Sequence, residues 1–416
     1  MKPKYLFMIG CCLLIFYGLL ANYFDFNART LGSLNNFGSA FRQLFVMAAI
    51  LILLGLLSWS TSNSIRTEIN SARFVRNWFG GFVPMLVIAL GIAIIVNPHA
   101  RFSGDLYPPV NVGARKIKMD LYRDLESVPD LVILGSSRAF TISPGYIEEK
   151  TGYSAFNMAI ESGDAGDFYL QSKLLVKSES TPRVLLIEIH QNSFGDVSKT
   201  WQLQPMAMVP YMPWKGALTL SEESLADALG LQSISDSIYS VFLSKQQGET
   251  WTINLDKYGT GIRTAPTHEE YKKLLNATIK GPTKNNVYCK RLSSDGKEIL
   301  EKMIALAKEN GIGVVLYESP MNFTFYSAAY EQNPDGFNSC RNLVNSYLSS
   351  LAESNPNVFF RDLSVYEPIS KLLEDGYYDA IHLRPKAAEM VVDVLIPDIE
   401  AAMAWSHQVS VKMPGQ

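Results

Sequence analysis

The chain has 416 residues, of which 47% are hydrophobic and only 19% are charged, and its 37 Lys and Arg against 40 Asp and Glu give a net charge of -3. The apolar content is high enough to build a core, which excludes a disordered chain. The near-neutral balance argues against a nucleic-acid-binding protein, which normally carries a basic surplus. Because globular domains carry about 25% charged residues, some part of this chain must be unusually apolar.

The apolar part lies in the first hundred residues. We predict a membrane anchor over residues 1–97, because runs without charged residues there approach the roughly 20 residues that a helix needs to cross a bilayer. A cleaved signal peptide is the alternative for the first run, since Lys2 and Lys4 precede it. The predicted membrane-spanning helices cover residues 5–24, 44–59 and 79–96.

Short basic segments set the expected orientation of this anchor. Lys2 and Lys4 precede the first run, and the segment 60–78 between the second and third runs carries further arginines. The positive-inside rule places both segments in the cytoplasm. We therefore expect a multi-pass protein of the inner or plasma membrane, in contact with the lipid bilayer, whose residues 98–416 lie outside the cytoplasm.

Beyond residue 97, short apolar runs alternate with amphipathic stretches, which is typical of a parallel sheet with helices on both faces. The runs 131–134 and 184–189 have the length and composition of buried strands. Ser143 and Pro144 are typical of a helix start. We predict an α/β domain over residues 98–416. Its other predicted strands cover 155–159, 314–317 and 358–360, and its other predicted helices cover a stretch after Gly166, 296–310, 342–352 and 385–403.

Residues 195–286 interrupt this alternation. The segment is rich in aromatic residues and proline, including Trp201, Trp214 and Trp251, and shows no regular strand and helix pattern. Long segments of this kind inside a domain are functional or carry structure of their own. Two interpretations stay open: a packed subdomain, or an insertion that faces the substrate, since aromatic rings pack well against sugar rings and acyl chains.

Cys289 and Cys340 are the only cysteines in residues 98–416. Outside the cytoplasm, a disulfide between them could persist. The sequence leaves open whether the two side chains meet.

Two separated motifs carry residues suited to nucleophilic catalysis. Gly135-Ser136-Ser137 follows the first predicted strand, at the end where open parallel sheets bind their ligands. Asp379 and His382 come late in the chain with three-residue spacing, so the carboxylate can orient the imidazole as the base that a serine nucleophile needs. Each motif alone occurs often by chance, but the two together predict a serine-dependent enzyme.

The pair of motifs resembles the SGNH hydrolase superfamily, also called GDSL-like lipases and acylhydrolases. The resemblance covers most of residues 98–416 and implies a flavodoxin-like parallel sheet. The family's Gly-Asp-Ser block matches Gly135 to Ser137, which implies Ser137 as the nucleophile and leaves Ser136 as the alternative. Ser136 stands where the family has aspartate. Asp379 is then the orienting acid, and His382 is the base.

The resemblance also implies an oxyanion hole. The family uses backbone amides, one of them from a glycine, and an asparagine side chain as donors. Residues 157–163 resemble the glycine block, which implies Gly163 as a donor beside the amide of Ser137. After the third predicted strand the family has Gly-x-Asn-Asp, whereas this chain has His-Gln-Asn-Ser, so Asn192 is the candidate side-chain donor.

Other polar residues are assigned structural roles. Asn157 is interpreted as a turn residue that bonds its own backbone. His190 is interpreted as a packed or exposed histidine, because no carboxylate stands at a fitting spacing. His99, His268 and His407 have no second ligand nearby in the sequence, so we predict neither a metal site nor a cofactor.

Membrane-anchored proteins of this type act in bacterial alginate O-acetylation and teichoic-acid D-alanylation. The resemblance therefore implies a serine-dependent acyltransferase or esterase that moves an O-acetyl or similar acyl group on a cell-surface or exported polysaccharide, or on another glycan of the cell envelope. A membrane-bound O-acyltransferase is the implied protein partner. The alternative is a non-catalytic assembly partner of such an acyltransferase with the same fold.

Overall fold

The computed structural model describes residues 87–102, 106–110, 113–177, 181–246, 254–281 and 287–412. The chain divides into two compact units. The first takes residues 1–111 and 224–250, and the second takes residues 112–223 and 251–416. All the residues predicted to carry chemistry belong to the second unit.

The prediction of three membrane-spanning helices is wrong, and with it the fold class that began with them and the multi-pass membrane location. In the part of the chain that the structure describes, no helix combines the length and the apolar character needed to cross a bilayer. Residues 87–96 of the third predicted span form a helix. Residues 5–24, 44–59 and 79–86 lie outside the described residues.

Five short segments form one parallel sheet. Four of them are buried throughout, as is usual for parallel strands, whereas the edge segment over residues 358–362 is mostly half-buried. The strands are β1 (Leu131–Leu134), β2 (Ala155–Asn157), β3 (Val184–Glu188), β4 (Gly313–Glu318) and β5 (Val358–Asp362). Their order is β2-β1-β3-β4-β5. Because the order reverses at β1 and β3, a ligand site is expected beyond the carboxyl ends of these two strands.

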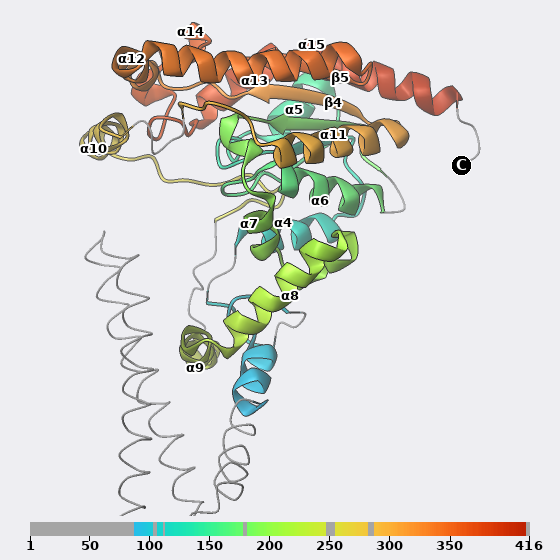
Figure 1. The fold of residues 1–416 in the computed structure, drawn as a ribbon, viewed down its shortest axis with the longest axis vertical. Coiled ribbons are helices and arrows are strands. Elements are labelled where there is room, and N and C mark those ends of the chain that lie inside the picture. Colours follow the sequence, from blue (N-terminus) through green and yellow to red (C-terminus); the bar gives the residue numbers. More distant parts are fainter. Residues whose placement is uncertain are drawn as a thin grey trace, which may run out of the picture. The chain divides into compact units, whose positions relative to one another are not determined.

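Helices cover both faces of the sheet (Figure 1). Successive strand residues point to opposite faces, so β1 contributes Leu131 and Ile133 to one core layer and Val132 and Leu134 to the other. The first layer packs against α5 (Pro144–Thr151) and α15 (Pro385–Lys412). The helices of the second layer are α4 (Ala114–Arg123), α6 (Ala165–Val176), α11 (Ser294–Glu309) and α13 (Pro334–Ser354).

The insertion over residues 195–286 is largely helical where it is described. Its helices are α7 (Val197–Gln202), a 3₁₀ helix (Met206–Tyr211), α8 (Trp214–Leu229), α9 (Leu231–Gln246) and α10 (His268–Ile279). Residues 247–253 and 282–286 lie outside the described residues. Two more helices, α12 (Phe323–Gln332) and α14 (Glu367–Ser370), follow later in the chain.

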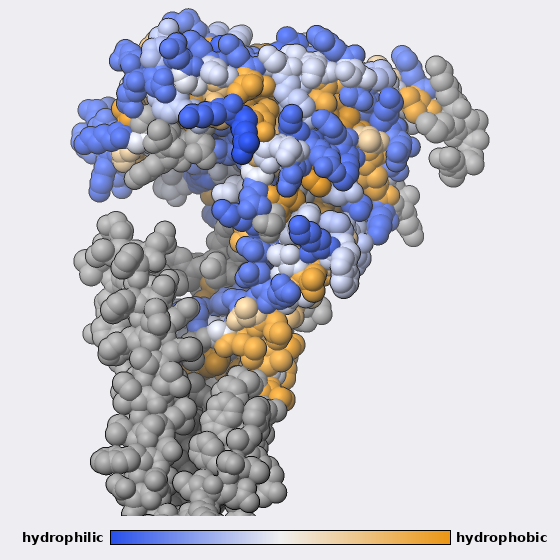
Figure 2. Space-filling model, in the orientation of Figure 1, coloured by the Kyte–Doolittle hydropathy of each residue, from blue (hydrophilic) through white to orange (hydrophobic). Residues whose placement is uncertain are grey.

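In the first unit, His99 joins two carboxylates. Its Nδ1 lies 2.8 Å from Asp227 and its Nε2 lies 2.9 Å from Asp236. Burial alone would lower the pKa of His99, but these two partners raise it to about 9. The charged imidazole therefore links the turn after the helix over residues 87–96 to α8 and α9. Apolar side chains such as Ile88 on that helix are exposed. Figure 2 shows orange surface where Figure 1 draws the blue helix.

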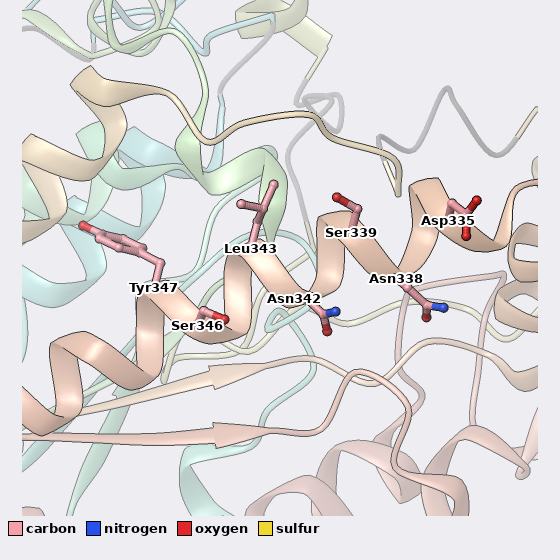
Figure 3. A pocket seen from close by; sticks show the side chains of 7 residues that line it. All are labelled: Asp335, Asn338, Ser339, Asn342, Leu343, Ser346 and Tyr347. Carbon is pink, nitrogen blue, oxygen red and sulfur yellow. The ribbon is translucent and has the colours of Figure 1, made fainter.

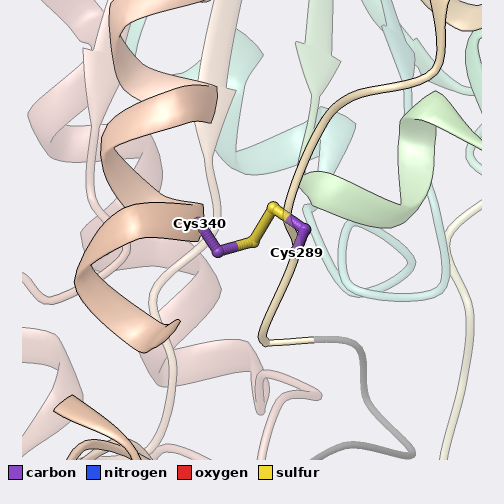
Figure 4. Close-up of a disulfide and its surroundings, with 2 residues drawn as sticks. All are labelled: Cys289 and Cys340. Atoms are coloured by element: carbon purple, nitrogen blue, oxygen red, sulfur yellow. A yellow bond between two sulfur atoms is a disulfide. The ribbon is translucent and has the colours of Figure 1, made fainter. Parts of the chain in front are cut away.

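Cys289 and Cys340 form a disulfide (Figure 4), with their Cα atoms 4.7 Å apart. Cys340 lies in α13, and Cys289 lies in the segment that precedes α11. The bridge closes a loop that contains α11, β4 and α12. It therefore encloses one strand of the sheet.

Candidate active site

Two glycines allow the loops after β1 and β2 to approach each other. A Cβ atom on Gly135 would lie 2.8 Å from the Cβ of Glu188 and 2.9 Å from that of Ala139. A Cβ atom on Gly163 would lie 2.5 Å from the carbonyl oxygen of Gly135. Since real Cβ atoms do not approach other atoms this closely, both positions require glycine. The close approach brings Gly163 next to the loop that carries Ser137.

The structure brings Ser137, His382 and Asp379 together at the carboxyl ends of the strands. The Oγ of Ser137 lies 2.8 Å from Nε2 of His382. The Nδ1 of the same imidazole lies 2.6 Å from Oδ2 of Asp379. Ser137 is half-buried, whereas its neighbours Ser136 and Arg138 are buried. The hydroxyl of Ser137 is therefore both paired with a base and open to solvent.

Asp379 stays ionised at neutral pH. Burial alone would raise its pKa, but the hydrogen bond and charge of His382 lower it to about 2, with the amides of Ile381 and His382 contributing. Both amides donate to Oδ1 of Asp379 at 2.9 Å. One carboxylate oxygen thus fixes the turn, and the other holds the imidazole.

The turn that carries Asp379 and His382 is bonded to two neighbouring loops. Thr141, four residues after Ser137, donates its hydroxyl to the carbonyl oxygen of Leu383 at 2.9 Å. The amide of Asn322, beyond β4, donates to the carbonyl oxygen of Ala380 at 3.0 Å. These bonds hold His382 close to Ser137, although 245 positions separate the two residues in the sequence.

Ser136, the alternative nucleophile, is directed away from His382. Its hydroxyl donates to Oε2 of Glu188 at 2.7 Å, and its amide donates to the same oxygen at 2.9 Å. Glu188 was not predicted as a site residue. The signal available in the sequence was a carboxylate at the end of a strand that is otherwise apolar, because a buried charge requires partners.

His190 does have a carboxylate beside it, which corrects the interpretation from the sequence. Its Nδ1 lies 3.1 Å from Oε1 of Glu188, two residues earlier. Burial and the charge of Arg138 lower the pKa of His190, so the imidazole is neutral near pH 7. Burial would raise the pKa of Glu188, but His190, Arg138 and the Ser136 hydroxyl lower it to about 2. With His190 neutral, Arg138 and Ser136 are the partners that keep this carboxylate ionised.

The predicted oxyanion donors differ in how the structure places them. The amide of Ser137 has no bonded acceptor among the described residues. The amide of Gly163 donates to the carbonyl oxygen of Ile160 at 3.3 Å, a long bond within a turn. Asn192 lies in a 3₁₀ helix (Gln191–Phe194) after β3 and is half-buried. In the described part of the chain, no hydrogen bond joins its side chain to Ser137 or His382.

Asn157 bonds to the backbone of the loop that follows Ser137. It is fully buried, and its Nδ2 donates to the carbonyl oxygens of Ala139 and Ile142, each at 2.9 Å. Its Oδ1 accepts the amide of Ala159 at 3.0 Å, the bond expected of a turn residue. The same oxygen accepts Nζ of the buried Lys118 at 3.0 Å.

Part of the insertion packs against the site loops. The amide of Gly261 donates to the carbonyl oxygen of Phe140 at 2.7 Å. The hydroxyl of Tyr378, next to Asp379, donates to the carbonyl oxygen of Arg263 at 3.2 Å. A shallow groove elsewhere lies along α13, lined by residues that include Asp335, Asn342 and Tyr347 (Figure 3). It contains none of the residues of the candidate active site.

Comparisons with known proteins add the following findings. No protein-family model matches the chain, and no curated protein is similar to it. Among solved structures, the chain is similar to a crystal structure described as a candidate acylhydrolase from Bacteroides fragilis. The two are 12% identical, the match covers 70% of this chain and 95% of the other, and the TM-score is 0.33. The assignment of the site rests on its own geometry.

Proposed function

We propose that the protein is a serine-dependent acyl-ester enzyme of the SGNH type, an esterase or acyltransferase. The observation that supports this most directly is the 2.8 Å contact between Ser137 Oγ and His382 Nε2, continued by the 2.6 Å contact to Asp379. A serine hydroxyl is a weak nucleophile unless a base takes its proton, and the imidazole is placed to do so.

In the proposed reaction, Ser137 Oγ attacks the carbonyl carbon of an acyl ester while its proton passes to Nε2 of His382. The bond to the leaving alcohol then breaks, His382 gives the proton to that alcohol, and the acyl group is left as an ester on Ser137. Water, or the hydroxyl of an acceptor, repeats the sequence and removes the acyl group. Asp379 keeps the other imidazole proton on Nδ1 and balances the positive charge that forms.

The unbonded amide of Ser137 is the best-placed donor for the oxyanion that develops in both steps. A donor of this kind contributes about 10²- to 10³-fold to turnover. The amide of Gly163 could join it, because its bond to Ile160 is long. A polysaccharide as the acylated substrate and an O-acyltransferase as a partner are proposed from the sequence resemblance to the membrane-anchored proteins alone, and no contact in the described residues bears on either.

The test is covalent labelling of the full chain with a fluorophosphonate probe, followed by peptide mass analysis. We expect one label, on Ser137, and none in Ser137→Ala or His382→Ala. Hydrolysis of p-nitrophenyl acetate should fall by about 10⁴-fold or more in Ser137→Ala. In Ser136→Ala the label should still appear on Ser137, because Ser136 bonds to Glu188 and not to the base.

A label that persists in Ser137→Ala would show that another residue is the nucleophile. If the unmodified protein takes no label and hydrolyses no ester, the enzyme assignment fails. The non-catalytic assembly partner would then be the better interpretation.

A further inference from the structure

Glu188 bonds to the backbone of the nucleophile loop from the neighbouring central strand. Its side chain is fully buried at the end of β3. One oxygen, Oε2, accepts both the amide and the hydroxyl of Ser136, the residue before Ser137. Gly135 makes this possible, because a side chain there would overlap Glu188.

These bonds determine which amide of the loop stays available. The amide of Ser136 is bonded to Glu188. The amide of Arg138 donates to Oγ of Ser136 at 3.3 Å, so it is bonded to the hydroxyl that Glu188 holds. The amide of Ser137 lies between these two and has no bonded acceptor among the described residues. Fixing both neighbours orients the peptide that carries this amide.

The charge of Glu188 is compatible with an oxyanion nearby. A lone buried carboxylate would oppose a developing negative charge, but the positive charge of Arg138 acts on this one. Hydrogen bonds to an ionised acceptor are also stronger than those to a neutral one. The carboxylate therefore holds the loop firmly without acting as an unscreened charge at the reaction centre.

We propose that Glu188 is a positioning residue for the reaction: by holding Ser136, it orients the Ser137 amide toward the oxyanion and the Ser137 hydroxyl toward His382. This role rests on the proposed function. It assigns to Glu188 no contact with the substrate and no proton transfer.

The experiment measures kcat and KM for p-nitrophenyl acetate in Glu188→Ala, Glu188→Gln, Ser136→Ala and the double variant Glu188→Ala with Ser136→Ala. We expect Glu188→Ala to lower kcat by about 10²-fold, as loss of an oxyanion donor does, with KM changed by no more than about twofold. Glu188→Gln should recover most of that loss, because an amide oxygen can accept the same two bonds. The double variant should be no slower than Glu188→Ala alone, since both substitutions remove the same hydrogen bond between Ser136 and Glu188.

Glu318→Gln is the matched control. Glu318 is also a buried glutamate, at the end of the adjacent strand β4, and its Oε2 has no hydrogen-bond partner in the described part of the chain. It should keep the kcat of the unmodified protein.

A kcat in Glu188→Ala within about threefold of the unmodified protein would overturn the proposal, as would losses that multiply in the double variant. If Glu188→Ala does not fold, Ser136→Ala carries the test. It removes the hydroxyl that bonds to Glu188, so its kcat should fall, and a kcat equal to that of the Glu318→Gln control would refute the role. The fluorophosphonate label separates the two proposals. A labelled Ser137 with kcat insensitive to Glu188 refutes the positioning role alone, whereas an unlabelled protein refutes the proposed function and this role with it.

Discussion

Breaking the Cys289–Cys340 disulfide should lower the stability of the second unit by a large and calculable amount. Cys289→Ala is the suitable perturbation, because Cys289 is half-buried in a loop. The buried side chain of Cys340, 2% exposed, stays in place, so no cavity is created in the core. The change therefore isolates the cross-link from the packing around it.

The magnitude follows from the length of chain that the bridge closes. The two cysteines are 51 positions apart. For a loop of that length, the loss of chain entropy in the unfolded state is worth about 4 kcal/mol at 25 °C. Engineered and native bridges usually deliver about 2 to 4 kcal/mol, so the value is near the upper end of that range.

Urea unfolding followed by circular dichroism measures the effect. We expect Cys289→Ala to unfold at a urea concentration lower by about 1 M or more. The unmodified protein treated with a reducing agent should unfold at the same concentration as the variant, and the reducing agent should not affect the variant further. If non-reducing peptide mapping finds the bridge but Cys289→Ala loses less than about 1 kcal/mol, the argument from loop closure around β4 is refuted.

Two further predictions concern buried polar groups. Burial and the charge of Asp362 raise the pKa of Glu318 from 4.5 to about 8, so the folded protein keeps this proton to a higher pH than the unfolded chain does. Its contribution to stability is present below pH 4.5 and is lost as the pH rises through 8. Glu318→Gln should remove roughly a few kcal/mol of the difference in unfolding free energy between pH 5 and pH 8. If urea unfolding gives the same difference for the variant and for the unmodified protein, this prediction is wrong. Asn157→Ala should cost about 2 to 4 kcal/mol, because it removes the bonds to Lys118 and to the buried carbonyls of Ala139 and Ile142, of which only that of Ala139 keeps another donor among the described residues. Thermal unfolding measures this loss, and an unchanged melting temperature would contradict it.

The strands could be predicted because their signal is local. Runs such as 131–134 and 184–189 are short, apolar and bounded by polar residues, and the structure has strands at both places. The helix start at Ser143 and Pro144 was equally local, and Ser143 caps α5 through its hydroxyl. The same reliance on apolar runs produced the wrong prediction of membrane-spanning helices, because the length of an apolar run in the sequence does not fix the length of the helix that it forms.

The candidate site could be predicted only in part, because its parts meet through the tertiary fold. The pairing of Ser137 with His382 came from a family resemblance, since no periodicity links residues 245 positions apart. The role of Glu188 could not be read from its neighbours, because its partner Ser136 lies on another strand end. The helices α8 and α9 were not predicted, although α9 has apolar residues at helical spacing in Leu231, Ile234 and Ile238.

The bond between Ser136 and Glu188 links two positions whose charges depend on each other. The SGNH block Gly-Asp-Ser has aspartate where this chain has Ser136. An aspartate here would place a second carboxylate against the buried Glu188, and two adjacent buried carboxylates cannot both stay ionised. We therefore expect related chains to carry either aspartate at this position with no carboxylate at the end of the third strand, or serine with one. The serine of this chain would then be one half of a coevolving pair, and correlated variation between the two positions would identify the subgroup of enzymes that shares it.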